Sequence, residues 1–366
     1  MRDDEAMEQA LAAGAAARRR TAPNPWVGCA LLRDGEIVGL GATEPPGGAH
    51  AEAGALARAG DRARGATAYV TLEPCSHHGR TPPCVDALVG AGVTRVVAAL
   101  EDPDPRVAGT GFARLRAAGI EVTVGVGAER AVRELAPYLH HRRTGRSFVV
   151  AKVASSIDGR VAAADRTSKW LTGDRARADA HELRADSQAI MVGAGTALAD
   201  QPQLTVRDVA LAPEHPPTRV LLDARGRVPA SGPLFDVRLA PTLVVTSPNA
   251  SADATDAWRA AGAKVEQVAA SAHGDGVDLD ETLALLAREG VLQVLVEGGG
   301  TLLGSMFSGA HAQRLVVYVA PLALGTRGTP ALAFSGPGTI GEARRHELTS
   351  VRRLGPDARL DYDVVA

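Results

Sequence analysis

The sequence predicts an α/β protein built from two domains. Its 366 residues suffice for about two domains of ordinary size. Apolar runs typical of strands alternate with helical stretches in both halves, which favours largely parallel sheets covered by helices. A polar, basic stretch at residues 140–146 separates the halves, so we expect domains at 1–144 and 145–366. We interpret this stretch as a solvated linker, with a phosphate contact as the alternative.

The first domain is expected to open with a helix and a hairpin. Asp3 or Asp4 can cap an alanine-rich helix that runs to about residue 20, where a Pro-Asn-Pro turn forbids helix. Asp34-Gly35 is the dipeptide that a tight type I′ hairpin prefers. The predicted strands are 27–33, 36–41, 68–72, 95–99 and 121–124. The predicted helices are 51–58, one after residue 83, 111–118 and one ending near residue 139.

The second domain continues the alternation of apolar runs and helical stretches. Because both element types recur, this half is also predicted to be α/β. Its predicted strands are 148–153, 189–192, 219–222, 242–245, 293–296 and 314–319.

Composition argues against several classes of function. Lys and Arg total 40 against 42 Asp and Glu, so the net charge of −2 provides no general attraction to nucleic acid or anionic membrane. Aromatic residues make up 3%, little material for stacking nucleic-acid bases. Three cysteines do not form a disulfide scaffold and fit a reducing compartment, so we expect a cytoplasmic protein. An acidic N-terminus and the absence of a long apolar run predict neither export nor membrane insertion.

Three potential metal ligands stand out in the first half. His50, Cys75 and Cys84 would give Zn²⁺ three protein ligands and leave the fourth tetrahedral position for water, as in catalytic zinc sites. Glu52 lies two residues after the histidine and could move a proton between that water and a leaving amine. Alternatively, the thiols are buried and His50 is a hydrogen-bonded loop residue. Cys29, inside a predicted strand, is expected in the core.

The spacing of these residues resembles the H-x-E…P-C-x-x-C signature of zinc deaminases, with one departure. Eight residues instead of two separate Cys75 from Cys84. Residues two apart on a helix face different ways, so His50 and Glu52 can meet one metal only at a helix's first turn, entered from a loop. The Gly-Gly-Ala sequence at 47–49 permits that entry.

A second candidate site is the Glu-Gly-Gly-Gly-Thr sequence at residues 297–301, between a strand and a helix. Glycines at such a turn let backbone N–H groups approach a phosphate at the helix N-terminus. A flexible turn is an equally good interpretation of the residues alone.

Four segments together resemble one known family. They are Pro-Asn-Pro-Trp-Val-Gly at 23–28, His-Ala-Glu at 50–52, the stretch 74–84 with its long cysteine spacer, and Lys-Val-Ala-Ser-Ser-Ile-Asp-Gly at 152–159. The sequence resembles the bifunctional riboflavin-biosynthesis deaminase-reductases over nearly its whole length. The resemblance implies a cytidine-deaminase-like three-layer domain followed by a dihydrofolate-reductase-like domain.

The same resemblance implies two consecutive reactions on small phosphoribosylaminopyrimidine substrates. The first half would remove the 2-amino group of 2,5-diamino-6-(5-phosphoribosylamino)-4-pyrimidinone with Zn²⁺. The second half would reduce the ribosyl group to ribityl with NADPH. The resemblance also suggests a homo-oligomer joined through the reductase half.

Site residues of the deaminase half follow position by position from the resemblance. His50, Cys75 and Cys84 match zinc ligands, and Glu52 matches the proton shuttle. The positions that match substrate contacts are Asn24, His77, Arg80 and Asp102. Asp104 stands where the family more often has Asn, which leaves its role undefined.

In the reductase half, we take Lys152 as the candidate for electrostatic or proton-transfer help at the reducing carbon, with a strand-end lysine reaching solvent as the alternative. The positions that match cofactor contacts are Ala154, Trp170, Thr196, Asp200, Gly299, Gly300, Thr301, Leu302, Leu303, Gly304 and Ser305. The positions that match substrate contacts are Ser168, Arg184, Leu204, Arg207 and Glu297. Ala224 replaces a cofactor-contacting Ser of the family.

Two other functions compete with this one. A nucleic-acid or nucleoside base deaminase with an accessory nucleotide-binding domain would use the same zinc chemistry on a flipped base. Alternatively, one half is inactive and serves as a scaffold. The near-zero net charge and the scarcity of aromatic residues count against the first alternative. An inactive deaminase is disfavoured because the set of His50, Glu52, Cys75 and Cys84 is complete.

Overall fold

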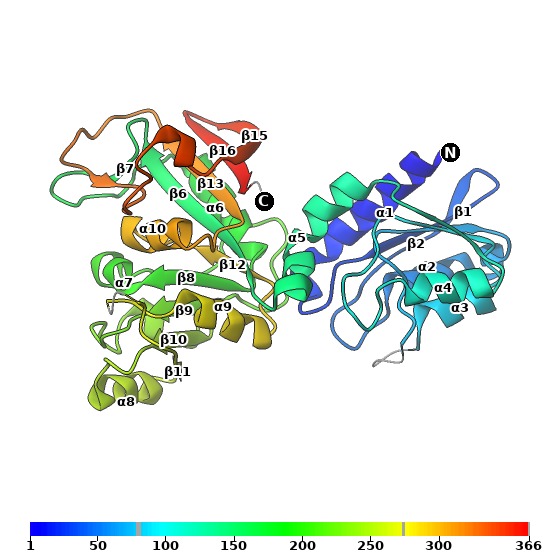
Figure 1. Cartoon of the computed structure of the whole chain (residues 1–366), viewed down its shortest axis with the longest axis horizontal. Coiled ribbons are helices and arrows are strands. Elements are labelled where there is room, and N and C mark those ends of the chain that lie inside the picture. The colour runs from blue at the N-terminus through cyan, green and yellow to red at the C-terminus, as the bar shows by residue number, and fades with distance from the viewer. Residues whose placement is uncertain (78–81, 273–274, 365–366) are drawn as a thin grey trace. The chain divides into compact units, whose positions relative to one another are not determined.

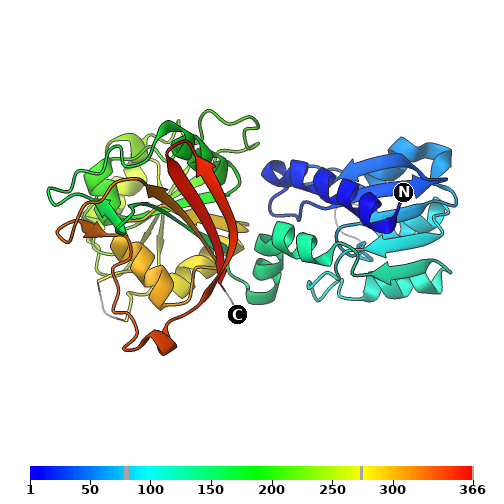
Figure 2. The ribbon, with the colours of Figure 1, turned by 90° about the horizontal axis from the view of Figure 1, so that it is seen from above.

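The computed structural model describes residues 1–77, 82–272 and 275–364. The chain divides into two compact units, Met1–Gly145 and Arg146–Ala366. Figures 1 and 2 show that each unit contains its own sheet with helices packed against it.

The first unit is built on a five-stranded sheet in the order β2-β1-β3-β4-β5. Strand β1 pairs antiparallel with β2 and with β3, whereas β3, β4 and β5 run parallel. The strands are β1 (Gly28–Arg33), β2 (Glu36–Ala42), β3 (Thr67–Val70), β4 (Arg95–Ala98) and β5 (Glu121–Val124). The helices are α1 (Asp3–Ala17), α2 (Ala51–Ala59), α3 (Cys84–Gly90), α4 (Thr110–Ala117) and α5 (Ala128–Thr144), with 3-10 turns at Arg18–Arg20 and Gly60–Ala63.

Small residues let α1 and α2 approach opposite faces of this sheet. A Cβ on Gly28 would lie 1.7 Å from the carbonyl oxygen of Ala10 in α1. A Cβ on Gly41 would lie 2.1 Å from the carbonyl oxygen of Ala51 in α2. Gly28 pairs with Ala42, the neighbour of Gly41, so the two glycines face opposite ways. This arrangement gives the expected three layers.

Two local predictions in this unit are wrong. The N-cap of α1 is Arg2, and Asp3 lies in the first turn, where its carboxylate accepts bidentate hydrogen bonds from Arg95. Helix α5 continues through the basic stretch to Thr144 and is closed by Gly145 with φ +69°. The predicted polar linker is therefore largely helix, because cations are favourable in a helix's last turn.

The second unit is built on a nine-stranded sheet in the order β11-β10-β9-β8-β12-β6-β13-β16-β15. Its neighbours are parallel from β11 to β13, and β16 and β15 continue antiparallel. These strands are β6 (Phe148–Ser156), β8 (Ala189–Gly193), β9 (Thr218–Leu222), β10 (Thr242–Thr246), β11 (Lys264–Gln267), β12 (Gln293–Val296), β13 (Arg314–Ala320), β15 (His346–Leu354) and β16 (Asp357–Val364). A separate pair is formed by β7 (Arg160–Ala162) and β14 (Thr329–Pro330).

Helices cover both faces of the parallel region (Figure 1). They are α6 (Asp174–Ala185), α7 (Ala194–Asp200), α8 (Ala252–Ala260), α9 (Leu279–Arg288) and α10 (Gly300–Ser308), with 3-10 turns at Pro233–Phe235 and Ile340–Glu342. Residues of α9 and α10 pack against one face of β6, β8 and β12 in one apolar cluster. Residues of α7 and α8 pack against the other face of the sheet, on β8, β9 and β10, in a second cluster. The six strands predicted for this half form the centre of the sheet.

The structure also bears on the thiols and on membrane association. Cys29 is completely buried in β1, as predicted, and all three cysteines are free. Within the described ranges, no helix has the length and apolar character needed to cross a membrane.

Candidate functional site

His50, Cys75 and Cys84 meet at one point of the first unit. The Nδ1 atom of His50 lies 3.6 Å from the Cys75 sulfur and 3.3 Å from the Cys84 sulfur, and the three ligand atoms lie within 4.8 Å of one another. A tetrahedral zinc ion with ordinary bond lengths separates nitrogen and sulfur ligands by roughly 3.5 Å. The donor set and its spacing therefore fit Zn²⁺.

The local fold explains how these ligands converge. His50 is the N-cap of α2 and has an extended backbone, so it enters from a loop, as the sequence requires. Cys75 follows β3, and Cys84 is the first residue of α3. The Cys84 N–H donates to the Cys75 sulfur at 3.3 Å, and the Val85 N–H donates to the Cys75 carbonyl at 3.2 Å. The beginning of α3 thus holds the two cysteines together despite their long spacer.

Glu52 lies beside this cluster in the first turn of α2 and is 3% exposed. Burial, with a smaller contribution from the charge of Cys75, raises the pKa of Glu52 to about 7. Hydrogen bonding from Cys84 and His50 lowers the pKa of Cys75, which favours the thiolate that binds metal. A carboxyl group that titrates near neutrality is suited to moving protons.

The other deaminase candidates lie on loops. Asn24 is half-buried in the turn before β1, and His77 follows Cys75 by two residues. The buried Nδ1 of His77 has no hydrogen-bond partner among the described residues, so it could meet a ligand. Arg80 lies outside the described residues.

Asp102 and Asp104 hold a loop in place. The Asp102 carboxylate accepts the Tyr138 hydroxyl at 3.0 and 3.1 Å and the backbone N–H of Asp104 at 2.9 Å. Asp104 accepts hydrogen bonds from the side chain and backbone of Arg106, which lower its pKa to about 2, and lies 3.6 Å from Arg142. Asp102 is 6% exposed. Its hydrogen bonds with Tyr138 and with the Asp104 backbone support the loop, in addition to any contact with substrate.

The second unit contains a partly buried group of charges around the end of β12. Glu297 forms a bidentate ion pair with Arg184 of α6 at 2.5 and 2.9 Å. Arg184 also donates to the carbonyl oxygen of Thr205. Lys152, in the middle of β6, is close enough to interact electrostatically with both. Lys152 is half-buried, and burial lowers its pKa. Strand β6 continues beyond it to Ser156, so Lys152 does not lie at the end of the strand.

The predicted glycine turn forms the start of helix α10. Gly299 is the N-cap of α10, and its N–H donates to the Thr196 hydroxyl at 3.0 Å. A Cβ on Gly300 would lie 2.4 Å from the carbonyl oxygen of Pro330, so glycine is required there. The remaining predicted cofactor positions within 301–305 follow along α10.

The other predicted reductase positions lie on separate segments. Ala154 is on β6, Asp200 ends α7, and Ser168 and Trp170 lie on the loop before α6. Trp170 is 71% exposed and stacks with Arg177. Ala224 is buried, and its carbonyl accepts the Ser247 hydroxyl at 2.8 Å.

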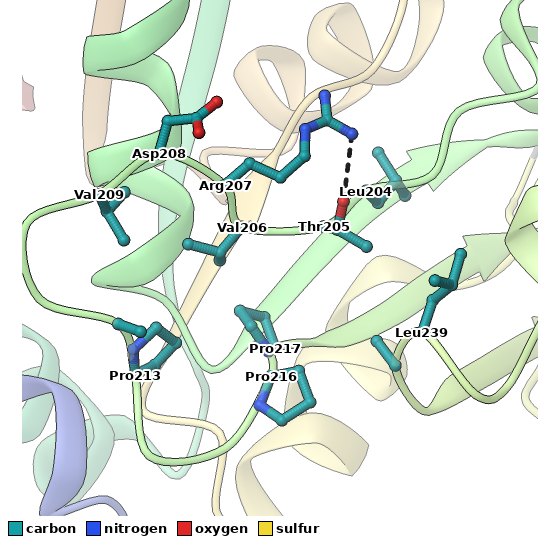
Figure 3. A pocket seen from close by; sticks show the side chains of 12 residues that line it. Leu204, Thr205, Val206, Arg207, Asp208, Val209, Pro213, Pro216, Pro217 and Leu239 are labelled. Carbon is teal, nitrogen blue, oxygen red and sulfur yellow. Dashed lines mark hydrogen bonds between the residues drawn. The ribbon is translucent and has the colours of Figure 1, made fainter.

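Leu204 and Arg207 line a pocket of about 290 Å³ (Figure 3). Leu204 is 2% exposed with φ +51°, and Arg207 donates to the Thr205 hydroxyl and to Gln203. The other lining residues, which sequence analysis did not single out, are Thr205, Val206, Asp208, Val209, Ala212, Pro213, Pro216, Pro217, Leu239 and Ala240. The proline-rich sequence of these residues predicts a loop and does not indicate a pocket.

Comparison with protein families assigns both units. Residues 1–100 match the family described as the cytidine and deoxycytidylate deaminase zinc-binding region. Residues 147–360 match the RibD C-terminal domain. The fold and the two sites thus define a two-domain enzyme, a deaminase joined to a reductase, with Zn²⁺ as cofactor of the first half and NADPH of the second.

Curated relatives match along almost the entire chain. The riboflavin biosynthesis protein RibD of Escherichia coli is 39% identical, over 98% of this chain and 99% of its own. RibD of Mycobacterium tuberculosis is 41% identical, over 98% of this chain and 96% of its own. The chain belongs to the RibD family of riboflavin biosynthesis proteins.

Solved structures agree with this assignment. Acinetobacter baumannii RibD, form 1, superposes with a TM-score of 0.89 at 36% identity, covering 100% of this chain and 99% of that chain. The diaminohydroxyphosphoribosylaminopyrimidine deaminase/5-amino-6-(5-phosphoribosylamino)uracil reductase of Thermotoga maritima has a TM-score of 0.85 at 30% identity, with 99% of each chain covered.

Proposed function

We propose that residues 1–144 deaminate 2,5-diamino-6-(5-phosphoribosylamino)-4-pyrimidinone and that residues 145–366 reduce the product's ribosyl group to ribityl. The observation that carries the proposal is the convergence of His50, Cys75 and Cys84 beside the buried carboxyl of Glu52. The Thermotoga maritima relative carries both activities in its name and covers 99% of the chain.

In the deaminase, His50, Cys75 and Cys84 would hold the zinc ion. When bound, zinc would supply the Lewis acidity that lowers the pKa of a water molecule. Glu52 would take up a proton from water and deliver it to the leaving amino group. Its position in the first turn of α2 places it beside His50, Cys75 and Cys84.

Asn24, His77, Arg80 and Asp102 are the substrate contacts proposed for this half. The unpartnered Nδ1 of His77 supports its contact. An arginine is suited to a ribose phosphate because its planar guanidinium binds two phosphate oxygens.

In the reductase, NADPH supplies a hydride when bound. The proposed cofactor contacts are the start of α10, Thr196, Asp200, Ala154 and Trp170. Lys152 stabilises or protonates the oxygen at the reducing carbon, and the Arg184–Glu297 pair supports it from the side of β12. Ser168, Leu204 and Arg207 complete the proposed substrate contacts.

The test uses Glu52→Gln in the full chain. We expect the variant to keep its zinc and to release ammonia about 10²–10⁴-fold more slowly, because the proton carrier is gone. Reduction of supplied deaminated substrate should continue at the wild-type rate. Ammonia release and NADPH oxidation can be followed in one cuvette, with zinc content measured in parallel.

Each other outcome has a distinct meaning. Wild-type protein that releases ammonia without consuming NADPH would leave the second half as a binding module. Wild-type protein with neither activity would favour the nucleic-acid or nucleoside base deaminase. Loss of both activities in a folded, zinc-loaded Glu52→Gln protein would contradict independent sites.

We also propose that the chain forms a homo-oligomer through its reductase half. Strand β15 is the outermost strand of the nine-stranded sheet and has nine residues, with Leu348 and Val351 at least half exposed. An exposed edge of this kind readily pairs with another strand. Light scattering after gel filtration should give a multiple of the chain mass, and a monomer at micromolar concentration would contradict the proposal.

We further propose that the protein works in the cytoplasm. The free thiols of the chain support a reducing compartment.

A further inference from the structure

Glu73 is a buried carboxylate that the proposed chemistry does not use. It is 4% exposed and lies two residues before Cys75. Both of its oxygens accept backbone hydrogen bonds from a distant segment around the beginning of α4. The donors are the N–H groups of Asp102 at 3.3 Å, Gly109 at 3.0 Å, Gly111 at 2.8 Å and Phe112 at 3.3 Å.

These bonds make Glu73 a cap for a helix to which it does not belong. The first N–H groups of a helix have no partner within the helix and carry partial positive charge. Gly109 is the N-cap of α4, and Gly111 and Phe112 lie in its first turn. One carboxylate therefore satisfies three of these donors, and the N–H of Asp102 completes the set.

The start of α4 contacts the Cys75 loop on both sides of the cysteine. Before Cys75, a Cβ on Gly111 would lie 2.1 Å from the carbonyl oxygen of Pro74, so the two backbones touch. After Cys75, the hydroxyls of Ser76 and Thr110 lie 2.6 Å apart, and Arg114 donates to the Ser76 carbonyl at 2.6 Å. Cys75 is thus bracketed by contacts to one helix.

These contacts help to fix the position of Cys75. Cys75 lies beyond the end of β3, on a loop without the regular hydrogen bonds of a strand. The eight-residue spacer to Cys84 is too long to set the distance between the sulfurs by itself. The start of α3 holds Cys75 by the hydrogen bond from the Cys84 N–H to its sulfur. On the other side, Glu73 ties the Cys75 loop to the segment that leads into α4 and to α4 itself.

We propose that Glu73 is a positioning residue of the zinc site, which holds the Cys75 loop against α4 so that the thiolate meets His50 and Cys84 at bonding distance. This inference rests on the proposed assignment of Cys75 as a zinc ligand. It concerns placement alone, because Glu73 contributes no ligand atom to the cluster.

The experiment compares Glu73→Gln with Glu101→Gln, the same chemical change at an exposed position in the neighbouring loop. A glutamine at 73 keeps the size but directs an N–H₂ group at backbone donors. Zinc affinity is measured by competition with a chromophoric chelator, below the unfolding temperature of each variant. We expect Glu73→Gln to bind zinc about 10–100-fold more weakly, as for other residues that support metal ligands. Glu101→Gln should equal wild type, and reduction by the same chain should be unchanged in both.

A cobalt spectrum separates positioning from general stability. Co²⁺ in place of zinc should show shifted or weakened d–d bands in Glu73→Gln, because the ligand geometry changes. Should that variant not fold, Thr110→Val removes the hydroxyl that contacts Ser76 in the same bracket, together with its hydrogen bond to the Val107 carbonyl, and should weaken zinc binding by a smaller factor. Wild-type affinity and wild-type cobalt bands in whichever variant folds would overturn the inference.

Cys75→Ser distinguishes this failure from failure of the proposed function. If Cys75→Ser loses zinc while Glu73→Gln binds it normally, the zinc site stands and the role of Glu73 is wrong. If Cys75→Ser retains wild-type zinc affinity, the ligand assignment itself is wrong and the inference falls with it.

Discussion

At the residue scale, the most informative group in the second unit is the charge triplet of Lys152, Arg184 and Glu297. Two cations and one anion leave an excess positive charge among side chains that are largely withdrawn from solvent. Coulombic attraction and direct hydrogen bonds from Arg184 lower the pKa of Glu297 to about 2 against the opposing effect of burial. Arg184 already forms a bidentate ion pair with Glu297. The positive charge of Lys152 is therefore not required to stabilise the fold.

We predict that Lys152→Met lowers kcat for reduction about 100-fold while ammonia release is unchanged. The same variant should unfold at an equal or higher temperature at pH 7, because the remaining pair is balanced. The folded-state pKa of Lys152 is lowered, so its protonated form costs stability at pH values below that pKa and the cost disappears above 10.5. Activity assays and thermal unfolding check both effects, with the exposed Lys264→Met as control. Wild-type reduction by Lys152→Met would exclude a role for the amine.

The pH profile of reduction offers a second test of the same residue. If the protonated amine assists the reaction, the rate should fall as pH rises through the lowered pKa of Lys152, which is below the 10.5 of an ordinary lysine. Initial rates of NADPH oxidation between pH 7 and 10 would show this limb. A flat profile over the range in which the enzyme stays folded would contradict it.

At the element scale, the position of the zinc ligands depends on how closely α2 approaches β2. Gly39 and Gly41 lie on the same face of β2, and a Cβ on either would lie within 2.2 Å of a backbone carbonyl oxygen in α2. Neither glycine has a positive φ, so the requirement is steric. The helix that begins after His50 and carries Glu52 is set by this backbone contact.

We therefore predict that Gly41→Ala displaces α2 and costs about 1–3 kcal/mol of stability in the first unit. Ammonia release should fall at least as strongly as zinc content, whereas reduction should be unaffected. Gly90→Ala is the matched control, because a Cβ there meets no atom within 4 Å. Unchanged deamination in Gly41→Ala would show that α2 can shift without moving the ligands.

At the scale of the whole molecule, the chain consists of two compact units, each with its own sheet and candidate site. The cluster of His50, Cys75 and Cys84 lies wholly in the first unit, and the Arg184–Glu297 pair lies wholly in the second. Chemistry in one unit therefore does not require ligand atoms from the other.

Removal of zinc tests this independence. We predict that a strong chelator abolishes ammonia release and leaves reduction of the deaminated substrate intact, and that added Zn²⁺ restores the first activity. Both reactions are followed before and after dialysis, with metal content measured at each step. Simultaneous loss of reduction would show that the second site depends on the folded, metal-loaded first unit.

Local sequence predicted much of the fold because strands and tight turns carry local signals. The strands at 121–124 and 293–296 have the predicted limits, and Asp34 and Gly35 both have the positive φ of a type I′ turn. The antiparallel pair β15 and β16 was not predicted, since its polar, half-exposed residues lack a strong apolar pattern. The extension of α5 was missed because a basic run is typical both of a linker and of a helix end.

The sequence by itself determined the two-domain α/β organisation, the zinc chemistry and the family, because residue types and their spacing are local properties. Only the tertiary structure decided that Lys152 is half-buried beside an ion pair, that Asp102 and Asp104 secure a loop, and that Glu73 caps α4. Each of these depends on contacts between segments far apart in the chain. Such contacts are set by packing and by the need to satisfy buried backbone groups, and spacing along the sequence does not encode them.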